Sequence, residues 1–276
     1  MTDKKVKELS KMGYEYIKAG DFDQAEALFK KALELDAENS FVLVGLGETA
    51  RKRKQFDSAI SYYQKVIDID RTNKYALLGL GDTLRGLKRR EEALKIWITY
   101  LESYPNDASI LSRVADIYRS LGDTDKAIEF YSKSLSVEKE CKFALMGMGN
   151  IYYKKKDLDS ALPYFEKLVE KNPSLLNILT IIGNIYRKKH NYEKACFYYS
   201  KVFDTDNRNA FAIYGMADAL SSMKNYEESL KYWHLLEGID SNNIRMFFKI
   251  SDCYQHLGNP EKAELYKKKV LEMDTN

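Results

Sequence analysis

The side chains that could perform acid–base, nucleophilic or metal chemistry are few and scattered along this sequence. They are His190, His234 and His256, together with Cys141, Cys196 and Cys253. None falls into the HExxH or CxxC spacing that would gather zinc ligands or form a redox pair. The string GLGDTLRG, from Gly79 to Gly86, superficially resembles a phosphate-binding loop, but it lies inside an apolar helical pattern. The sequence therefore predicts no active site, no metal and no cofactor, and hence not an enzyme.

A second kind of chemistry comes from acidic and amide side chains that recur every 34 residues. They are Glu48, Asp82, Asp116, Asn150, Asn184, Asp218 and Asp252. Arg51, Arg85, Arg119 and Arg187 each follow one of them after three residues. An extended peptide offers a backbone donor and acceptor at every residue, so such a ladder could hold one. The alternative is that each Asp or Asn pairs with the neighbouring Arg in an empty groove, and both arrangements remain open.

These side chains are positioned by a repeat that fills the chain. Its most regular residue is a small one, found at Ala25, Ala59, Ala93, Ala127, Ala161, Ala195, Ser229 and Ala263. With that residue numbered position 20, eight repeats begin at Val6, Ser40, Lys74, Ala108, Lys142, Leu176, Ala210 and Ile244. A fixed period overrides a domain count based on length, so we expect one solenoid over residues 1–276.

Two helices account for the pattern within each repeat. Apolar or small residues at positions 4, 7, 8 and 11 lie on one face of a helix, here named helix A, and those at positions 20, 24 and 27 define helix B. Position 15 is Gly or Lys in seven repeats, which suits the end of helix A. Position 16 is Asp or Asn in six repeats, which suits the cap of helix B.

This pattern resembles the tetratricopeptide repeat, whose signature is W-x2-L-G-x2-Y, then A-x3-F, then P. The best copy contains Leu145, Met148, Gly149, Tyr152, Ala161, Phe165 and Pro173. The resemblance covers residues 6–276, although the final proline occurs only at Pro105 and Pro173, and Pro163 is expected to bend a helix B. It implies an all-α fold, a right-handed superhelical solenoid of antiparallel helix pairs with helix A lining the inner surface. The chaperone-binding clamp of the family is absent, because position 5 is never Lys and position 6 is never Asn.

The resemblance also implies that positions 2, 5, 9 and 12 of helix A face the groove. Position 2 is aromatic in four repeats, at Phe41, Tyr75, Phe143 and Phe211, and position 5 in the same repeats is Val44, Leu78, Met146 and Tyr214. These side chains either contact a ligand or pack between adjacent A helices. Position 6 of the same repeats is Gly45, Gly79, Gly147 and Gly215. Because glycine destabilises a helix, we expect these positions to leave room for a ligand backbone, and the alternative is room for a neighbouring helix.

Basic runs fall where helix A should end, at residues 51–54, 88–90, 154–156 and 187–189. Cations there complement the helix dipole, and the alternative is a rim that binds acidic or phosphate groups. The net charge of +3 is small for 276 residues and argues against a nucleic-acid partner. Widely spaced cysteines, no signal-peptide pattern in MTDKKVKEL and no long apolar window indicate a cytoplasmic protein that does not bind a membrane.

The sequence thus favours a non-catalytic protein–protein interaction scaffold or adaptor, which binds a peptide or helix of a partner protein in its concave groove. One alternative is a self-assembling repeat protein, a homo-oligomer in which another copy occupies the groove or the last repeat. Another is an RNA-binding helical-repeat protein, although such repeats run to 35 residues and carry a more basic groove.

Overall fold

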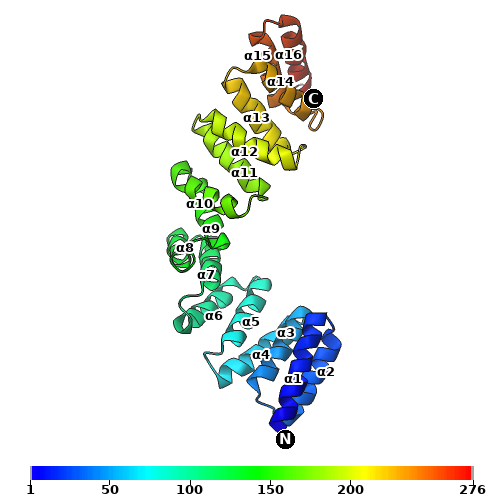
Figure 1. Ribbon diagram of the computed structural model, residues 1–276, viewed down its shortest axis with the longest axis vertical. Helices are drawn as coiled ribbons and strands as arrows, with labels where there is room; N and C mark the ends of the chain where they lie inside the picture. The colour runs from blue at the N-terminus through cyan, green and yellow to red at the C-terminus, as the bar shows by residue number, and fades with distance from the viewer. Residues whose placement is uncertain (1, 275–276) are drawn as a thin grey trace. The chain divides into compact units, whose positions relative to one another are not determined.

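The computed structural model describes residues 2–274, and within that range every regular element is an α-helix. The helices follow one another as eight A–B pairs, one pair for each predicted repeat (Figure 1). In chain order they are α1 (Thr2–Ala19), α2 (Phe22–Leu35), α3 (Ser40–Lys52), α4 (Phe56–Ile69), α5 (Lys74–Gly86), α6 (Arg90–Ser103), α7 (Ala108–Leu121), α8 (Thr124–Val137), α9 (Lys142–Lys154), α10 (Leu158–Lys171), α11 (Leu176–Lys188), α12 (Tyr192–Thr205), α13 (Ala210–Ser222), α14 (Tyr226–Glu237), α15 (Ile244–His256) and α16 (Pro260–Asp274). The all-α fold class is confirmed.

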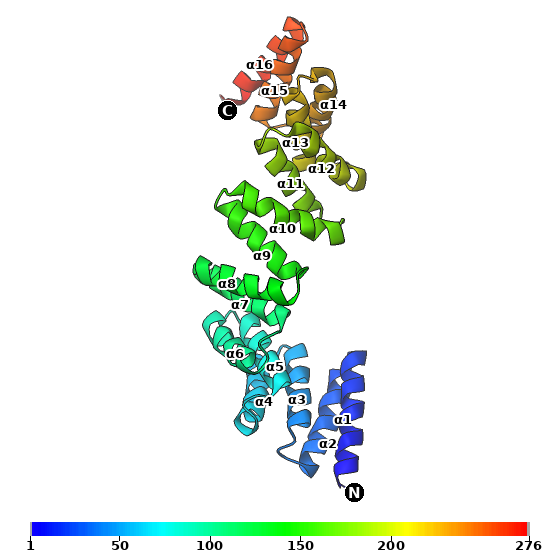
Figure 2. The same cartoon turned by 60° about the vertical axis from the view of Figure 1, so that its left-hand side comes forward.

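The chain forms two compact units, Met1–Gly147 and Met148–Asn276, whose boundary lies inside α9. In the first unit α1, α3 and α5 contact one another in order, and each also contacts the B helix of its own repeat. In the second unit α11, α13 and α15 do the same (Figure 2). Each repeat therefore packs on its neighbour within a unit, and one continuous solenoid over residues 1–276 stays a prediction.

The turn between helices A and B has the same backbone conformation in every repeat. Position 15 has a positive φ in all eight: Gly20, Lys54, Lys88, Gly122, Lys156, His190, Lys224 and Gly258. A residue in this left-handed conformation ends a helix because it turns the chain away from the helical path. The sequence expectation that helix A stops at position 15 is confirmed.

Side-chain caps begin most of the helices. Asp21, Asp123, Asp157, Asn191 and Asn259, all at position 16, accept a hydrogen bond from a backbone N–H in the first turn of helix B. At the last position of a repeat, Asn39, Asn73, Asp107, Asn209 and Asn243 cap the next helix A in the same way. Capping groups satisfy backbone donors that have no partner within the helix. Pro163 lies inside α10, which continues past it to Lys171.

The core of each repeat is built around the side chain at position 24. Phe29, Tyr63, Trp97, Tyr131, Phe165, Tyr199 and Trp233 are all at most 2% exposed. The eighth repeat has Lys267 there, exposed and beside Glu264. In the first repeat, Met12 at core position 7 is 45% exposed. The first repeat thus presents a less covered face and the eighth a more polar one.

Candidate protein-binding surface

Aromatic side chains at position 2 stand exposed at the start of four A helices. Phe41, Tyr75 and Phe143 in the first unit are 59%, 67% and 60% exposed, and Phe211 in the second is 78% exposed. Phe41 also contacts the ring of Tyr14, at 4.7 Å between centroids. Rings this large are normally buried, so their exposure on one end of the A helices makes them candidates for contact with a partner.

Position 5 behaves differently from position 2, because its side chains are at least partly packed. Val44 is buried, and Leu78, Met146 and Tyr214 are half-buried. The Tyr214 ring stands edge-on to Trp233, with 5.0 Å between centroids. For this position the structure favours packing between helices over an open ligand contact.

Each glycine at position 6 faces an aromatic ring of the preceding repeat, which occupies the space that a side chain would need. A Cβ atom on Gly45, Gly79, Gly147 or Gly215 would lie under 3.0 Å from ring atoms of Phe29, Tyr63, Tyr131 or Tyr199, respectively. These rings are fully buried and have no space into which to move. The expectation that the glycines leave room for a ligand backbone is therefore wrong, because the ring at position 24 already fills that space.

A second glycine faces the same ring from within its own repeat. A Cβ atom on Gly13, Gly47 or Gly183, at position 8, would meet Phe29, Tyr63 or Tyr199, respectively. The ring of helix B thus explains why position 8 of helix A is small. Each of these rings lies between two glycines that are 32 residues apart, one on each of two neighbouring A helices.

Where the core residue is tryptophan, a cation replaces the glycine of the following repeat. The Arg113 guanidinium lies 5.6 Å from the centre of the Trp97 ring and pairs with Asp82. In the second unit, Lys249 lies 2.7 Å from Asp218, in the repeat that contains Trp233. The sequence analysis missed Arg113 and Lys249. Their signal was a charged residue at position 6 directly after a repeat with tryptophan at position 24.

Most of the polar ladder at positions 9 and 12 bonds within the protein. The Tyr131 hydroxyl donates to Asp116 at 2.5 Å, and Arg119 lies 3.1 Å from the same carboxylate. The Tyr199 hydroxyl donates to Asn184 at 2.8 Å. The ladder thus ties core tyrosines to the inner surface.

Arginines in the ladder pair with carboxylates of their own or the next repeat. Arg85 is 3.7 Å from Asp82, and Arg187 pairs with Asp218 across one repeat. The alternative of internal Asp–Arg pairing is therefore realised at three repeats. Among the described residues, Glu48 and Asn150 make no side-chain hydrogen bond or ion pair. Asn150 has no hydroxyl to accept from, since its repeat carries Phe165 at position 24.

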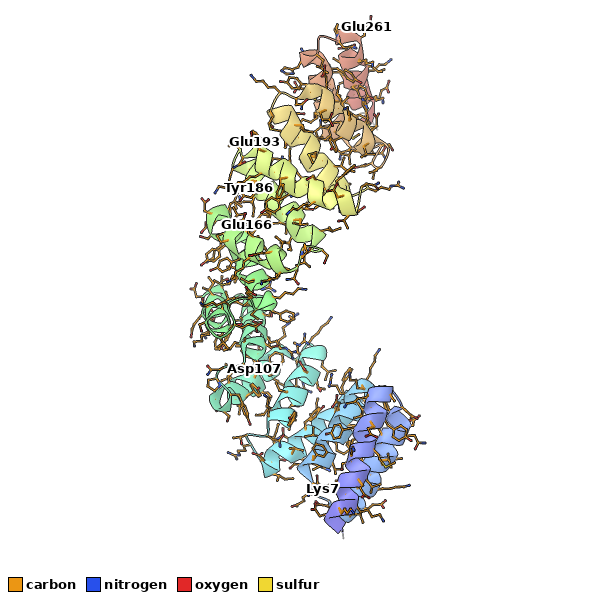
Figure 3. All side chains as sticks on the ribbon, in the orientation of Figure 1. Lys7, Asp107, Glu166, Tyr186, Glu193 and Glu261 are labelled. Atoms are coloured by element: carbon orange, nitrogen blue, oxygen red, sulfur yellow. The ribbon has the colours of Figure 1, made fainter. Side chains whose placement is uncertain are left out.

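Burial raises the pKa of Tyr63 and of Tyr199 to about 12, and the nearby Arg51 and Arg187 guanidinium groups only partly oppose this. These hydroxyls therefore stay protonated and remain donors at neutral pH. On the B-helix side, the Tyr186 hydroxyl donates to Glu166 at 2.6 Å, and Figure 3 shows both side chains in neighbouring repeats. Burial raises the pKa of Tyr186 as well, together with that hydrogen bond.

No arrangement for metal binding emerges from the part of the chain that the structure describes. Within residues 2–274, His, Cys, Asp and Glu side chains form no group of three or more that could hold a metal ion. His234 lies between Glu237 and Tyr254, each 3.0 Å away. Over the same residues, no helix combines the length and the apolar composition needed to cross a bilayer.

Comparison with known proteins gives a consistent result along the chain. Models of the tetratricopeptide repeat match residues 10–74, 75–140, 143–175, 176–209 and 244–276. The matched ranges leave out residues 210–243, where α13 and α14 form the seventh pair. A comparison with curated protein sequences gives no significant match.

Solved structures share the fold. MamA is 29% identical with a TM-score of 0.55, over 59% of this chain and 95% of MamA. PilF of Pseudomonas aeruginosa is 19% identical with a TM-score of 0.65, over 76% of this chain and 96% of PilF. YrrB, described as a TPR protein with an unusual peptide-binding site, is 19% identical with a TM-score of 0.56, over 67% of this chain and 96% of YrrB. The eight helix pairs, their shared turn and these matches lead to one conclusion: the chain belongs to the tetratricopeptide repeat family.

Proposed function

We propose that this protein is a non-catalytic scaffold that binds a peptide or helix of another protein on the surface formed by its A helices. Members of the family generally act as protein-interaction scaffolds. The observation that carries the proposal is the exposure of Phe41, Tyr75, Phe143 and Phe211 at the start of their A helices. Burying an exposed aromatic side chain contributes about 1.5–3 kcal/mol, so a few such rings anchor a partner effectively.

Polar groups on the same surface supply orientation. Glu48 in the first unit and Asn150 in the second have no internal partner, so each is free to bond a backbone group of the ligand. Asp82, Asp116 and Asp218 are already paired, and a ligand would have to exchange those bonds. The polar contribution therefore concerns specificity more than affinity.

We also propose a reducing compartment such as the cytoplasm. All three cysteines are free, and Cys141 and Cys253 are buried. Burial raises the pKa of the partly exposed Cys196 thiol, which disfavours its reactive thiolate. Thiols of this kind suit packing rather than disulfide formation.

The experiment is a pulldown with crosslinking mass spectrometry, using wild type and the variant Tyr75→Ala/Phe143→Ala. Both rings are exposed, so each substitution should change the free energy of unfolding by no more than about 0.5 kcal/mol. The partner should nevertheless be lost, and crosslinks should map to the A helices. The matched control is Phe197→Ala, which removes a ring that is 54% exposed on a B helix.

Two results would contradict binding of another protein on this surface. One is full retention of the partner by the double variant, with loss in the control. The other is recovery of the chain itself as the sole partner, with an oligomer in light scattering, which would support self-assembly instead. Turnover of a substrate that depends on a single A-helix side chain would overturn the non-catalytic assignment.

A further inference from the structure

We propose that the A–B turns of repeats two and three form a second binding surface, which docks an acidic segment of a partner protein. We name it the basic edge and define it as Lys52, Arg53, Lys54, Lys88, Arg89 and Arg90. The first three end α3 and enter its turn, and the last three join α5 to α6. All six lie in the first unit, at or beyond the end of the A helix opposite position 2, so this inference goes beyond the proposed function.

The first observation is backbone strain at two of these cations. Lys54 and Lys88 have φ values of 62° and 61°, in the left-handed region. The flanking repeats place Gly20 and Gly122 at the same position, where glycine adopts this conformation without a steric penalty. Repeats two and three, like repeats five and seven, therefore hold a lysine where glycine would be more stable.

Stabilisation of helix C-termini accounts for some of these cations but not for all. Lys52 and Lys88 lie at the negative ends of α3 and α5, where a positive charge is favourable. Arg89 and Arg90, however, are the N-cap and first residue of α6. That end of a helix is positive, so the dipole disfavours both arginines.

Repeats two and three also lack the Asp or Asn that the other six repeats carry at position 16. Gln55 and Arg89 stand there instead, and neither side chain makes a cap hydrogen bond. Arginine has no acceptor, and the Gln55 amide accepts no bond from the first turn, so helix B lacks a side-chain cap in both repeats. Strain and a missing side-chain cap thus coincide at two neighbouring turns, and at the second of them two cations also lie at a helix N-terminus.

The charge balance at this edge differs from that of its neighbours. At positions 13 to 19, repeats two and three together carry six cations against three carboxylates, Asp57, Glu91 and Glu92. Repeats one and four each carry one cation against two carboxylates over the same positions. Repeats five and six carry the same ratio of six cations to three carboxylates, but there Asp157 and Asn191 cap helix B. The basic edge thus differs from its flanking repeats in charge and from repeats five and six in its missing caps.

Four cations of the basic edge remain available to a partner. Arg53 pairs with Asp23 and Glu26, and Arg89 pairs with Glu92 at 2.6 Å. Among the described residues, Lys52, Lys54, Lys88 and Arg90 have no ion pair. A shallow hollow of about 290 Å³ lies beside three of the edge residues, lined by Lys88, Arg89, Arg90, Glu91, Glu92 and Leu121.

The side chains at this edge favour an acidic peptide over a nucleic acid. Single-stranded nucleic acids need aromatic side chains on which bases stack. The exposed residues of the two turns include no aromatic ring, and Phe56 between them is half-buried. Three of the four free cations are lysines, which act as point charges suited to the separate carboxylates of an extended Asp/Glu run.

The test uses the full chain and a fluorescent peptide of roughly ten glutamates, long enough to span two adjacent turns. Wild type should bind it, and the affinity should fall steeply as salt is raised. In Lys54→Gly/Lys88→Gly, two cations are lost and two strained residues are relieved. This variant should melt at a higher temperature and bind about three- to tenfold more weakly.

Lys224→Gly is the matched control, because Lys224 has the same backbone conformation, with φ 61°, in a turn without a basic cluster. It should also melt higher but bind the peptide as wild type does. A second variant, Arg89→Asp, installs the cap residue of the other repeats. It should stabilise α6 and weaken peptide binding at least tenfold, since a cation becomes an anion.

Three outcomes would overturn the proposal. In the first, the double variant binds the peptide with the same affinity as wild type. In the second, the double variant melts at a lower temperature than wild type, which would assign the lysines to helix stabilisation. A single-stranded RNA of equal charge could bind more tightly than the peptide and depend on the same lysines, which would assign the edge to a nucleic acid.

Discussion

At the scale of single residues, the side chain at position 24 restricts what the following repeat can place at position 6. Tyr63 and Tyr199 are followed by glycine, whose missing side chain leaves room for the ring. Trp97 is followed by Arg113, which lies over the indole and reaches Asp82. The residue at position 6 is therefore matched in size to the position 24 side chain of the preceding repeat. A substitution at either position changes the packing between the two repeats.

This matching gives a direct test in the variant Gly79→Ala/Gly147→Ala. Each new methyl group would lie against a buried tyrosine ring, and overpacking of this kind costs about 1–3 kcal/mol per site. We expect a lower urea midpoint with an unchanged slope. The control is Gly86→Ala, since a Cβ atom there meets nothing within 4 Å and alanine favours the helix by about 0.5–1 kcal/mol. A double variant that melts higher than wild type would restore the view that the space is kept for a ligand.

At the scale of helices, buried tyrosine hydroxyls connect helix B to the polar ladder on helix A. Tyr199 of α12 donates to Asn184 of α11, and Tyr131 of α8 donates to Asp116 of α7. The contact holds the inner surface of helix A in a fixed rotation about its axis, since the ladder residue cannot turn away without leaving a buried donor unpaired.

The raised tyrosine pKa values predict how stability depends on alkaline pH. Tyr63 and Tyr199 titrate at about 12 in the folded protein, above the value of about 10 for an unfolded chain. A group whose folded pKa is raised contributes stability that is present below pH 10 and is lost as the pH rises to 12. We expect the free energy of unfolding to fall by about 1.4 kcal/mol per pH unit for each tyrosine in that window.

Urea titrations at several pH values will measure this dependence in wild type and in Tyr63→Phe/Tyr199→Phe. The double variant should be less stable at neutral pH, because two hydroxyl contacts are lost, but its stability should fall less steeply between pH 10 and 12. Identical slopes in the two proteins would contradict the assignment of the alkaline transition to these residues.

At the scale of the whole molecule, each repeat depends chiefly on its neighbours. The side chains of α14 that α15 and α16 cover include Trp233 and Leu236, both buried. Stability in such an array is close to a sum of repeat and interface contributions. The protein should therefore lose stability in steps rather than all at once.

Removal of residues 244–276 tests this expectation. The shortened chain should keep roughly seven-eighths of its helical circular dichroism and unfold at a lower urea concentration. Removal of residues 210–276 should lower the midpoint further. Complete loss of helical signal on the first truncation would show that the chain folds as one indivisible unit instead.

Much of the local structure follows from the sequence alone. Asp or Asn at position 16 and Gly or Lys at position 15 predicted where helices begin and end, since caps and left-handed residues act within a single turn of chain. The spacing of apolar residues predicted two helices per repeat because the period of an α-helix is local. Eight copies in phase made these predictions consistent along the whole chain.

The tertiary structure decided what the inner surface offers. Positions 2 and 5 are both apolar in the sequence, yet Phe143 is exposed and Val44 is buried, because burial depends on how neighbouring helices pack. Gly79 was assigned to a ligand although its space is filled by Tyr63, sixteen residues earlier, in the preceding repeat. Arg113 and Asp82 are 31 residues apart and meet only because repeats stack. Such contacts are set by the distance between helices, which the periodicity of one sequence does not specify.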